Sequence, residues 1–484
     1  MLTATGRPWW HAAAAIVVVA LMLLWPALLN RQPMLFPDTV GYERAGVVAL
    51  HVAGFDARDG EAGAAADTVA GVPHGSRGVS TVRSPFYGIP LAALLAVGGA
   101  WAAAGAQALI VAAALMLAAR QQNVPWRVGV PAAGALIAVS GIAVFSSALM
   151  PDIFLALMIL GFATLLAAPA MRRAETAFWL ALMLAAMLFH KAFLAVAVGI
   201  TLGALIAERR VMLRRGVLVL LATTCTLGAA GHFVVELAVK RYTGRESVGV
   251  PFMLARYAAS PVLIDYLDDQ CEVPQFALCV YRSRLPLQPD AFLWGPHNVY
   301  AGLSELERRA ITEEATTVLG NAFAARPVAT LLEAIDGSTR QFFTVGMSDY
   351  AIGVPSATRI DEVLAPTMRD YPASRVAQHS FPFDAAGGAA LACYLSGLAA
   401  LAVACWRLRP RATARDTADP DGAVFAATIV AGLIINAVIS GSLSGVFDRY
   451  QGRIAWLAPY AAVLLLAGRA PRPGGPPRKT ERPA

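Results

Sequence analysis

The chain has 484 residues, of which 57% are hydrophobic and 15% are charged, and its mean hydropathy is +0.57. This composition excludes a cytosolic enzyme, a nucleic-acid-binding protein and a disordered scaffold, and it indicates a polytopic membrane protein. The formal charge of +7 is unevenly divided, because residues 236–385 hold 13 Lys or Arg against 18 Asp or Glu. The basic excess therefore belongs to the apolar part of the chain, where it reports on membrane topology and not on affinity for nucleic acid.

Apolar runs long enough to form membrane helices recur along the chain, since roughly 20 apolar residues cross about 30 Å of hydrocarbon. The first run continues into Asn30-Arg31 without a small-residue cleavage site, which predicts an uncleaved first helix and not a signal peptide. In chain order the runs are about 10–29, 86–98, 101–119, 127–146, 152–169, 176–189, 192–207, 216–235, 387–406, 423–441 and 454–468.

Short Arg-rich loops between these runs predict their orientation, because basic loops stay in the cytoplasm. The loops contain Arg120 with Arg127, Arg172-Arg173, Arg209-Arg210 with Arg214-Arg215, and the group from Arg407 to Arg415. All of them face the same side only if the run 86–98 does not span; its 13 residues would give about 20 Å of helix. We therefore interpret 86–98 as a re-entrant or juxtamembrane helix that breaks at Gly98-Gly99.

The fold class predicted is an all-α polytopic membrane protein with about ten transmembrane helices, the re-entrant helix and a mostly helical extracytoplasmic domain. We expect a bacterial inner-membrane location, with both termini cytoplasmic and the domain periplasmic. The predicted divisions are a transmembrane module at 1–235 with a long outer loop at 30–100, the external domain at 236–385, further transmembrane helices at 386–470, and a basic tail at 471–484.

Two features of the external domain are open to a structural check. Cys271 and Cys279 lie eight positions apart and are candidates for a disulfide, because the periplasm is oxidising. The sequence Ser304-Glu305-Leu306-Glu307 has the form of a capping box that opens a helix, and Pro327 begins a second amphipathic stretch that ends near Phe343.

Polar residues gather at the predicted outer boundary of the membrane, where their placement is costly and informative. Asp38 follows the first helix; it is either a cap for the next helix or a base at the membrane surface. Asp152 opens a later helix, where it serves the helix dipole or assists the chemistry. The same loop as Asp38 also supplies Tyr42 and, after a Gly- and Ala-rich section, Arg83.

Cationic residues join this boundary from two other places. His190-Lys191 separates two short apolar runs, so that the ammonium group either snorkels to the interface or lines an anion-binding cavity. The loop 442–453 brings Arg449, Tyr450 and Arg453 to the outer side, against the usual charge bias. Guanidinium groups there suit phosphate oxygens, and a salt bridge to Asp448 is the alternative.

Four features occur together in this chain: an Asp beyond helix one, a long outer loop with a Ser-Pro-Phe-Tyr entry, a second outer Asp and a late Arg-Tyr. In this combination the chain resembles the GT-C superfamily of glycosyltransferases, of the mannosyltransferase and aminoarabinose-transferase type. The resemblance implies a polyprenyl-phosphate sugar donor, with Asp38 as general base and Asp152 as a second acidic residue. It implies that Lys191, Arg449 and Arg453 meet the carrier phosphate, and that Asp38 and Asp152 are the ligands in members that bind Mg²⁺ or Mn²⁺.

The chain departs from that family in its Pro-Asp-Thr sequence at 37–39 and in an external domain that lies between spans, so the lipid, glycan or protein acceptor is left open. The chemistry itself needs one base and a cationic clamp, since a phosphate leaving group departs as an anion. Three alternatives are compatible with the same predicted membrane orientation: an O-antigen ligase-like enzyme, a transporter or flippase, and a non-catalytic envelope scaffold. A transporter is disfavoured, because the ionisable residues crowd the boundary and not mid-span.

Overall fold

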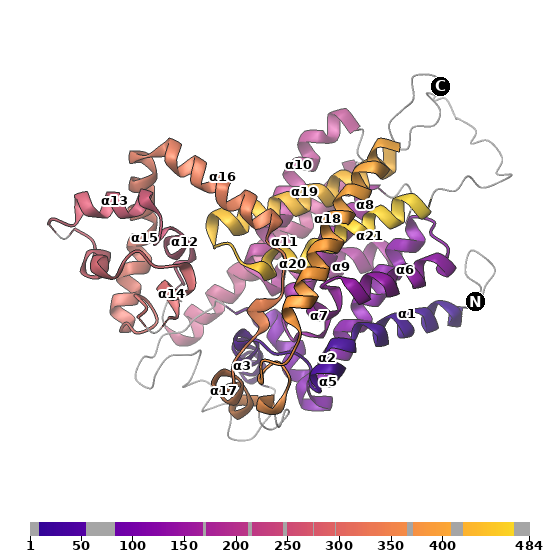
Figure 1. Ribbon diagram of the computed structural model, residues 1–484, viewed down its shortest axis with the longest axis horizontal. Coiled ribbons are helices and arrows are strands. Elements are labelled where there is room, and N and C mark those ends of the chain that lie inside the picture. Colours follow the sequence, from indigo (N-terminus) through magenta and orange to yellow (C-terminus); the bar gives the residue numbers. More distant parts are fainter. Residues whose placement is uncertain are drawn as a thin grey trace.

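The computed structural model describes residues 9–54, 83–167, 171–211, 215–244, 249–273, 275–295, 297–364, 371–407 and 420–468. Within these ranges the chain is helical and forms no β-strand, only an isolated bridge between Met34 and Ala148 (Figure 1). Residues 55–82 of the first outer loop and the whole basic tail, 471–484, lie outside the described residues.

The helices of the first half of the chain follow the predicted apolar runs closely. They are α1 (Trp9–Leu23), α2 (Trp25–Asn30), α3 (Pro37–Val52), α5 (Pro85–Gln121), α6 (Trp126–Val139), α7 (Ile142–Ser147), α8 (Asp152–Ala167), α9 (Arg173–Phe189), α10 (Lys191–Val211) and α11 (Arg215–Thr243). The two short runs around His190 are thus separate helices, as predicted.

The second half begins with short helices and ends with long apolar ones. They are α12 (Phe252–Tyr257), α13 (Pro261–Gln270), η1 (Ala277–Arg284), α14 (Pro289–Leu293), α15 (Glu305–Ala325), α16 (Pro327–Phe343), η2 (Ser348–Tyr350), α17 (Val354–Leu364), η3 (Tyr371–Ala373), α18 (Phe383–Arg407), α19 (Pro420–Leu443), α20 (Asp448–Ala455) and α21 (Leu457–Ala467). The Ser304 capping box and the Cys271–Cys279 disulfide are both present, as predicted.

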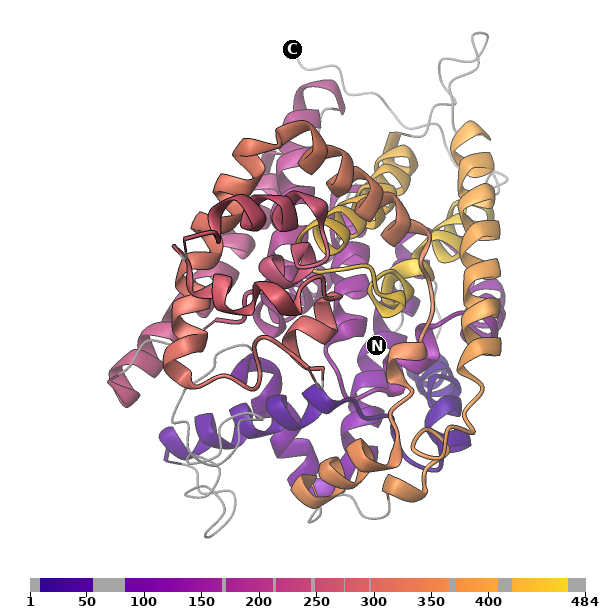
Figure 2. The ribbon, with the colours of Figure 1, turned by 60° about the vertical axis from the view of Figure 1, so that its left-hand side comes forward.

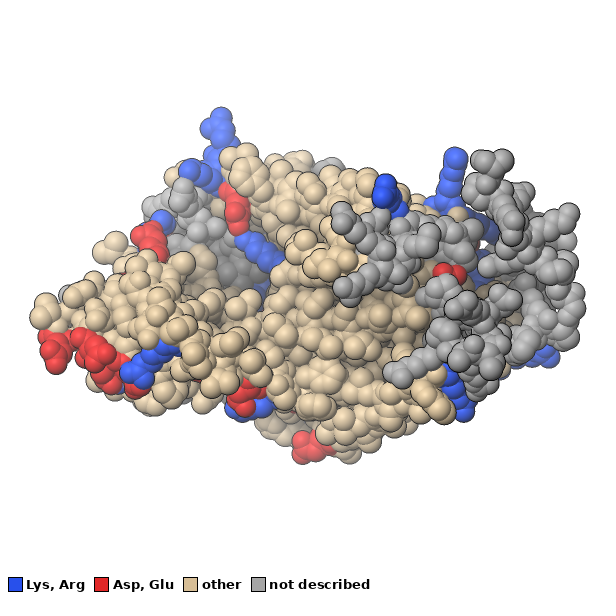
Figure 3. All heavy atoms as spheres, turned by 90° about the horizontal axis from the view of Figure 1, so that it is seen from above, with Lys and Arg blue, Asp and Glu red and all other residues tan. Residues whose placement is uncertain are grey.

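Several helices are suited to a membrane, which agrees with a multi-pass protein. Among the described residues five helical segments are long and apolar enough to cross one, or up to six if the bent pair α15 and α16 is counted. The five are Trp10–Asn30, Pro85–Gln121, Arg215–Tyr242, Phe383–Arg407 and Asp421–Leu443. On the face in Figure 3, charged side chains gather towards the two ends, and a broad middle expanse carries few of them.

The predicted boundary at Gly98-Gly99 corresponds to a kink and not to a gap between helices. Both glycines leave helical geometry, with φ −148° at Gly98 and φ 66° at Gly99, yet α5 continues on either side of them. Arg83 lies just before this helix and Arg120 lies in its last turn, so α5 connects the predicted outer boundary to a basic loop.

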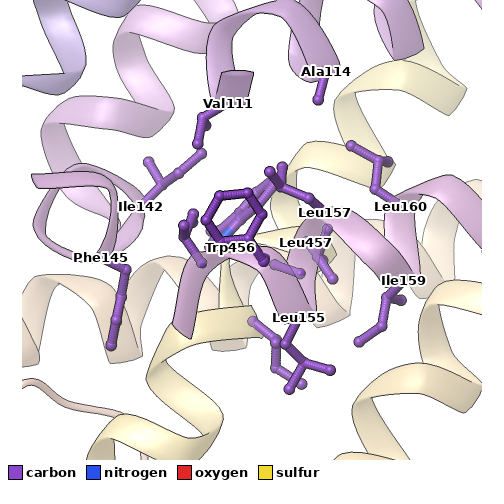
Figure 4. Packing of buried hydrophobic residues seen from close by; sticks show 14 of the residues in the cluster. Val111, Ala114, Ile142, Phe145, Leu155, Leu157, Ile159, Leu160, Trp456 and Leu457 are labelled. Carbon is purple, nitrogen blue, oxygen red and sulfur yellow. The ribbon is translucent and has the colours of Figure 1, made fainter. Parts of the chain in front are cut away.

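Buried apolar side chains form two cores. The larger one lies among the long helices, where Trp456 packs between residues of α5, α7 and α8 such as Val111, Ile142 and Leu157 (Figure 4). The smaller one joins α12 to α15, and these helices lie together at one end of the molecule (Figures 1 and 2). The stretch predicted as one external domain, 236–385, contributes to both, because residues from Val345 onward pack into the larger core.

One close helix crossing positions the start of α3. A Cβ atom added to Gly46 would lie 2.1 Å from the carbonyl oxygen of Gly88, so α3 and α5 touch through their backbones. Beside this crossing Tyr42 packs edge-on against Tyr87, with 5.1 Å between ring centroids. Only glycine fits at such an approach, and the crossing holds Asp38 and Arg83 near each other.

Candidate functional site

Asp38 lies in the first turn of α3, in contact with Arg83. The Oδ1 atom of Asp38 is 2.5 Å from an Nη atom of Arg83, and the two side chains are 23% and 21% exposed. Phe36 is the N-cap residue, and its N–H donates to the Thr39 hydroxyl at 3.1 Å. The capping interaction considered for Asp38 is therefore made by Thr39, and the carboxylate faces Arg83.

Asp152 is held close to the start of α3 by backbone pairing. The Met34 N–H donates to the Ser147 carbonyl at 3.1 Å, and the Leu149 N–H donates to the Met34 carbonyl at 2.9 Å. The Thr39 hydroxyl donates to the Leu149 carbonyl at 3.0 Å. These contacts join the segment before α3 to the segment before α8, so the first residues of the two helices lie together.

The carboxylate of Asp152 is buried and fully engaged. Its Oδ1 atom accepts a hydrogen bond from Arg453 at 2.8 Å, and its Oδ2 atom accepts one from the Tyr350 hydroxyl at 2.9 Å. The side chains of Arg453 and Asp152 are only 5% and 7% exposed. A buried carboxylate that is both ion-paired and hydrogen-bonded is a rigid element of the structure.

Residues 448–455, expected as a loop, form the helix α20, which places Arg449 and Arg453 one turn apart on one face. The Arg449 guanidinium stacks over the Phe36 ring at 4.3 Å, and its Nε atom is 3.6 Å from the Asp349 carboxylate. The Arg453 guanidinium lies over both Phe193 and Tyr450, 5.1 Å from each ring centroid. Aromatic faces thus hold both arginines in place.

His190 lies in the turn between α9 and α10 and faces the same group of charges. Its Nδ1 atom accepts a hydrogen bond from the Ala192 N–H at 3.2 Å, and its ring stacks on Phe193 at 4.9 Å. Burial lowers the pKa of His190 to about 3, and the charges of Arg453 and Arg83 lower it further. The imidazole is therefore neutral at physiological pH.

Tyr42 is the residue that connects the two carboxylates electrostatically. Burial raises the pKa of its hydroxyl; the charges of Asp38 and Asp152 add to the rise, while those of Arg83 and Arg449 oppose it. Four charged groups, from α3, α8, α20 and the segment before α5, therefore act on the Tyr42 hydroxyl. We define the outer cluster as these charges with their contacts: Asp38, Tyr42, Arg83, Asp152, His190, Asp349, Tyr350, Arg449 and Arg453.

Lys191 is not brought into the outer cluster. Its ammonium group pairs with Glu236 of α11 at 2.5 Å, and the lysine side chain is 52% exposed. Lys191 and Glu236 line a small surface pocket with His232 and Ser84.

Tyr450 lies within the region of the outer cluster. Its ring lies under the guanidinium groups of both Arg449 and Arg453, and its hydroxyl lies 3.3 Å from the Ser444 hydroxyl.

Asp349 and Tyr350 were not among the residues predicted from the sequence. Asp349 lies beside Asp448, and burial together with that second carboxylate raises the pKa of Asp349 to about 7. The Asp448 Oδ2 atom accepts hydrogen bonds from the Ser348 N–H and hydroxyl, at 2.9 Å and 2.5 Å. The only available signal was a polar Ser-Asp-Tyr sequence between two helical stretches, and no spacing rule connects it to Asp152.

Five buried side-chain polar atoms of the described residues have no hydrogen-bond partner, and four of them belong to this region. They are Asp349 Oδ2, Asp448 Oδ1, Arg449 Nε and Arg453 Nε. Buried polar atoms are nearly always satisfied in proteins, so a concentration of exceptions is typical of a functional site.

The donors present do not fit a divalent cation held by Asp38 and Asp152. Each carboxylate already faces a guanidinium group, and Arg449 adds a third positive charge. Within the described part of the chain, no three His, Cys, Asp or Glu side chains are grouped as a metal-ligand set. The chemistry of the outer cluster is therefore derived below from its own side chains.

No protein-family model matches the chain, and neither the curated proteins nor the solved structures include a significant match.

Proposed function

We propose that the chain is a membrane glycosyltransferase that moves a sugar from a polyprenyl-phosphate carrier to an envelope acceptor. The single observation that supports this most is that one cluster contains both a partly exposed carboxylate, Asp38, and a guanidinium held by aromatic stacking, Arg449. The first is a base that a hydroxyl group can reach, and the second is a cation suited to a phosphate.

In the proposed reaction Asp38 takes the proton from an acceptor hydroxyl as that oxygen attacks the anomeric carbon of the donor. A new C–O bond forms while the bond between the anomeric carbon and the phosphate oxygen breaks, which inverts the configuration at that carbon. The electron pair leaves with the phosphate, so no acid has to protonate the leaving group. One carboxylate with one free oxygen is enough for this step.

The roles of the other charged residues are assigned from the number and length of their contacts. Among the described residues Arg449 has one ionic contact, the long one to Asp349 at 3.6 Å, so its stacked guanidinium is the cation that we assign to the departing phosphate. Arg83 orients the Asp38 carboxylate, and the buried pair of Asp152 and Arg453 supports the wall of the cluster. Asp152 is then a structural residue and not a second catalytic acid.

The finer topology is also proposed: about ten spans, both termini in the cytoplasm and the outer cluster facing the periplasm. The ion pair from Glu175 to Arg120 supports it, because it joins two predicted cytoplasmic loops on the same side. Those loops begin or end α5 and α9, whereas Arg83 and His190 lie at the opposite ends of the same helices. Labelling of single cysteines placed at Arg127 and at Asp336, from outside intact cells, should succeed only at 336.

The test of the activity uses the purified protein in vesicles, with labelled undecaprenyl-phosphate hexose as donor and envelope extract as acceptor. We expect Asp38→Asn to lower transfer by about 10²- to 10⁴-fold, the usual contribution of a general base. The control is Glu313→Gln, which removes a 69% exposed carboxylate of α15, a helix of the smaller core, and should leave the rate unchanged.

Undiminished transfer by the Asp38→Asn protein would contradict the assignment of the base. Transfer from a diphosphate-linked glycan, with none from the monophosphate sugar, would instead support the O-antigen ligase-like alternative.

A further inference from the structure

Helix α16 carries an apolar stripe that no other part of the described chain covers. Val328, Leu331, Leu332 and Ile335 are between 53% and 70% exposed. Their spacing of three and four residues places them along one side of the helix. A continuous apolar stripe of this kind is rare on a surface that faces water and is typical of a surface with a partner.

The opposite side of α16 is already packed. A Cβ atom added to Gly337 would lie 2.6 Å from the carbonyl oxygen of Gly441, so α16 and the end of α19 touch backbone to backbone. Arg256 of α12 donates to the Gly441 carbonyl at 2.8 Å and pairs with Glu333 at 3.3 Å. The partner of the stripe must therefore approach from the outer surface of α16.

A polar edge separates the stripe from the packed side. Asp336 and Arg340 are both exposed and form an ion pair at 3.6 Å one turn apart. A helix with one apolar side, a charged edge and a packed side has the pattern of an element that lies in the plane of a membrane surface. The edge has equal numbers of acidic and basic groups, so apolar burial, and not attraction to anionic lipid, is the source of affinity.

The place of α16 in the fold indicates what covers the stripe. Gly337 contacts α19 at Gly441, close to the end of a helix that is long and apolar enough to span a membrane. Near that end α19 itself exposes Ile434, Val438 and Leu443. The chain bends by 109° between α15 and α16, and α16 leads from α15 towards α20 and the outer cluster (Figures 1 and 2).

We propose that α16 is an interfacial helix whose stripe of Val328, Leu331, Leu332 and Ile335 is buried in the membrane leaflet on the side of the outer cluster. This inference rests on the membrane location of α19 and does not depend on sugar transfer.

The helix also connects that leaflet to the outer cluster. The Gln341 side chain donates to the Phe447 carbonyl at 2.8 Å and accepts from the Phe447 N–H at 2.9 Å. These two bonds fix the residue that precedes α20, so the depth of α16 in the leaflet sets the height of Arg449 above the lipid.

The test measures the depth of spin labels on α16. In a protein whose free cysteines Cys225, Cys393 and Cys405 are replaced by alanine, nitroxides are attached at Leu332→Cys or at Ile335→Cys, and a third variant, Leu331→Cys, covers a failure of either. The water-facing control is Glu313→Cys on α15, where the native side chain is 69% exposed. All proteins are placed in vesicles of zwitterionic phosphatidylcholine, and relaxation by oxygen and by a water-soluble nickel chelate is compared.

We expect the ratio of oxygen to nickel accessibility to be several-fold higher at 331, 332 and 335 than at 313, for labels about 5–10 Å below the lipid headgroups. A ratio equal to that of the control would overturn the proposal. Exclusion of both reagents together with dipolar broadening between labels would also overturn it, because a second copy of the chain would then cover the stripe.

Discussion

Two of the ion pairs in the outer cluster, Asp38–Arg83 and Asp152–Arg453, have the same chemistry and differ in their surroundings. The Asp38 and Arg83 side chains are 23% and 21% exposed, and among the described residues Arg83 is the one ionic partner of the carboxylate. The Asp152 and Arg453 side chains are 7% and 5% exposed, and Tyr350 binds the second oxygen of the aspartate.

This difference is the basis for proposing a reactive role for Asp38 and a structural role for Asp152. A partly exposed carboxylate can exchange its partner for a substrate hydroxyl at small cost, because water and Arg83 already compete for it. A buried carboxylate cannot, because loss of one partner leaves an uncompensated charge in an apolar surrounding. Sequence position alone makes Asp38 and Asp152 look equivalent, since each begins a helix at the same boundary.

The largest effect that separates the pairs is expected for the buried one. Arg453→Met should lower the free energy of unfolding by about 3–5 kcal/mol, because it leaves the Asp152 charge buried without a counter-ion. Arg83→Met should lower it by less than about 1 kcal/mol. Thermal unfolding in detergent measures both, and the double variant Asp152→Asn with Arg453→Met should recover part of the loss. Equal losses for the two single variants would remove the distinction.

An intermediate effect is expected for Asp349, whose side chain is 24% exposed. Its pKa in the folded protein is about 7, raised by burial and by Asp448 from an ordinary value of 3.8. The folded state therefore keeps a proton that the unfolded state releases, so stability falls as pH rises from about 4 to 7, by up to about 4 kcal/mol. Unfolding temperatures across that range should show the fall, and Asp349→Asn should flatten it. The same slope in the Asn variant would assign the titration to another group.

The smallest effect is expected for the third pair, Lys191–Glu236, which lies outside the outer cluster. Both side chains are about half exposed, so Lys191→Gln should change the free energy of unfolding by less than about 1 kcal/mol. Sugar transfer should also be unchanged, because Arg449 supplies the contact to the phosphate. If this variant loses transfer by more than about tenfold, or 1.4 kcal/mol, Lys191 belongs to the donor site after all.

Local sequence signals predicted the helices well. The capping box at Ser304, the break at Gly98-Gly99 and the separation of two short helices at His190 all depend on neighbouring residues, and all are present. The helix α20 was not predicted, because its short run of polar residues is typical of a loop. The contact that fixes its start comes from Gln341, more than a hundred positions away, which binds the residue before the helix.

The outer cluster was predicted only in part, for a related reason. Asp38, Asp152 and Arg449 lie in the first turns of α3, α8 and α20, and the predicted topology puts these three helix starts at the same boundary. Their individual partners are long-range contacts that no periodicity encodes; Tyr350 and Asp152 are separated by 198 positions. The structure places Lys191 outside the cluster: His190 has extended backbone between α9 and α10 and faces the charges, whereas Lys191 begins α10 and pairs with Glu236 of α11.

The backbone contact between Gly46 and Gly88 has a consequence for how this protein can vary. Any side chain at either position would push α3 away from α5, and the reactive aspartate would lose its orienting arginine. Substitution is thus constrained at Gly46 and Gly88, two positions without a reactive side chain, whatever the length of chain between them. Distant homologues should be recognisable by a small residue one or two turns after each member of the Asp38–Arg83 couple, even where overall identity has faded.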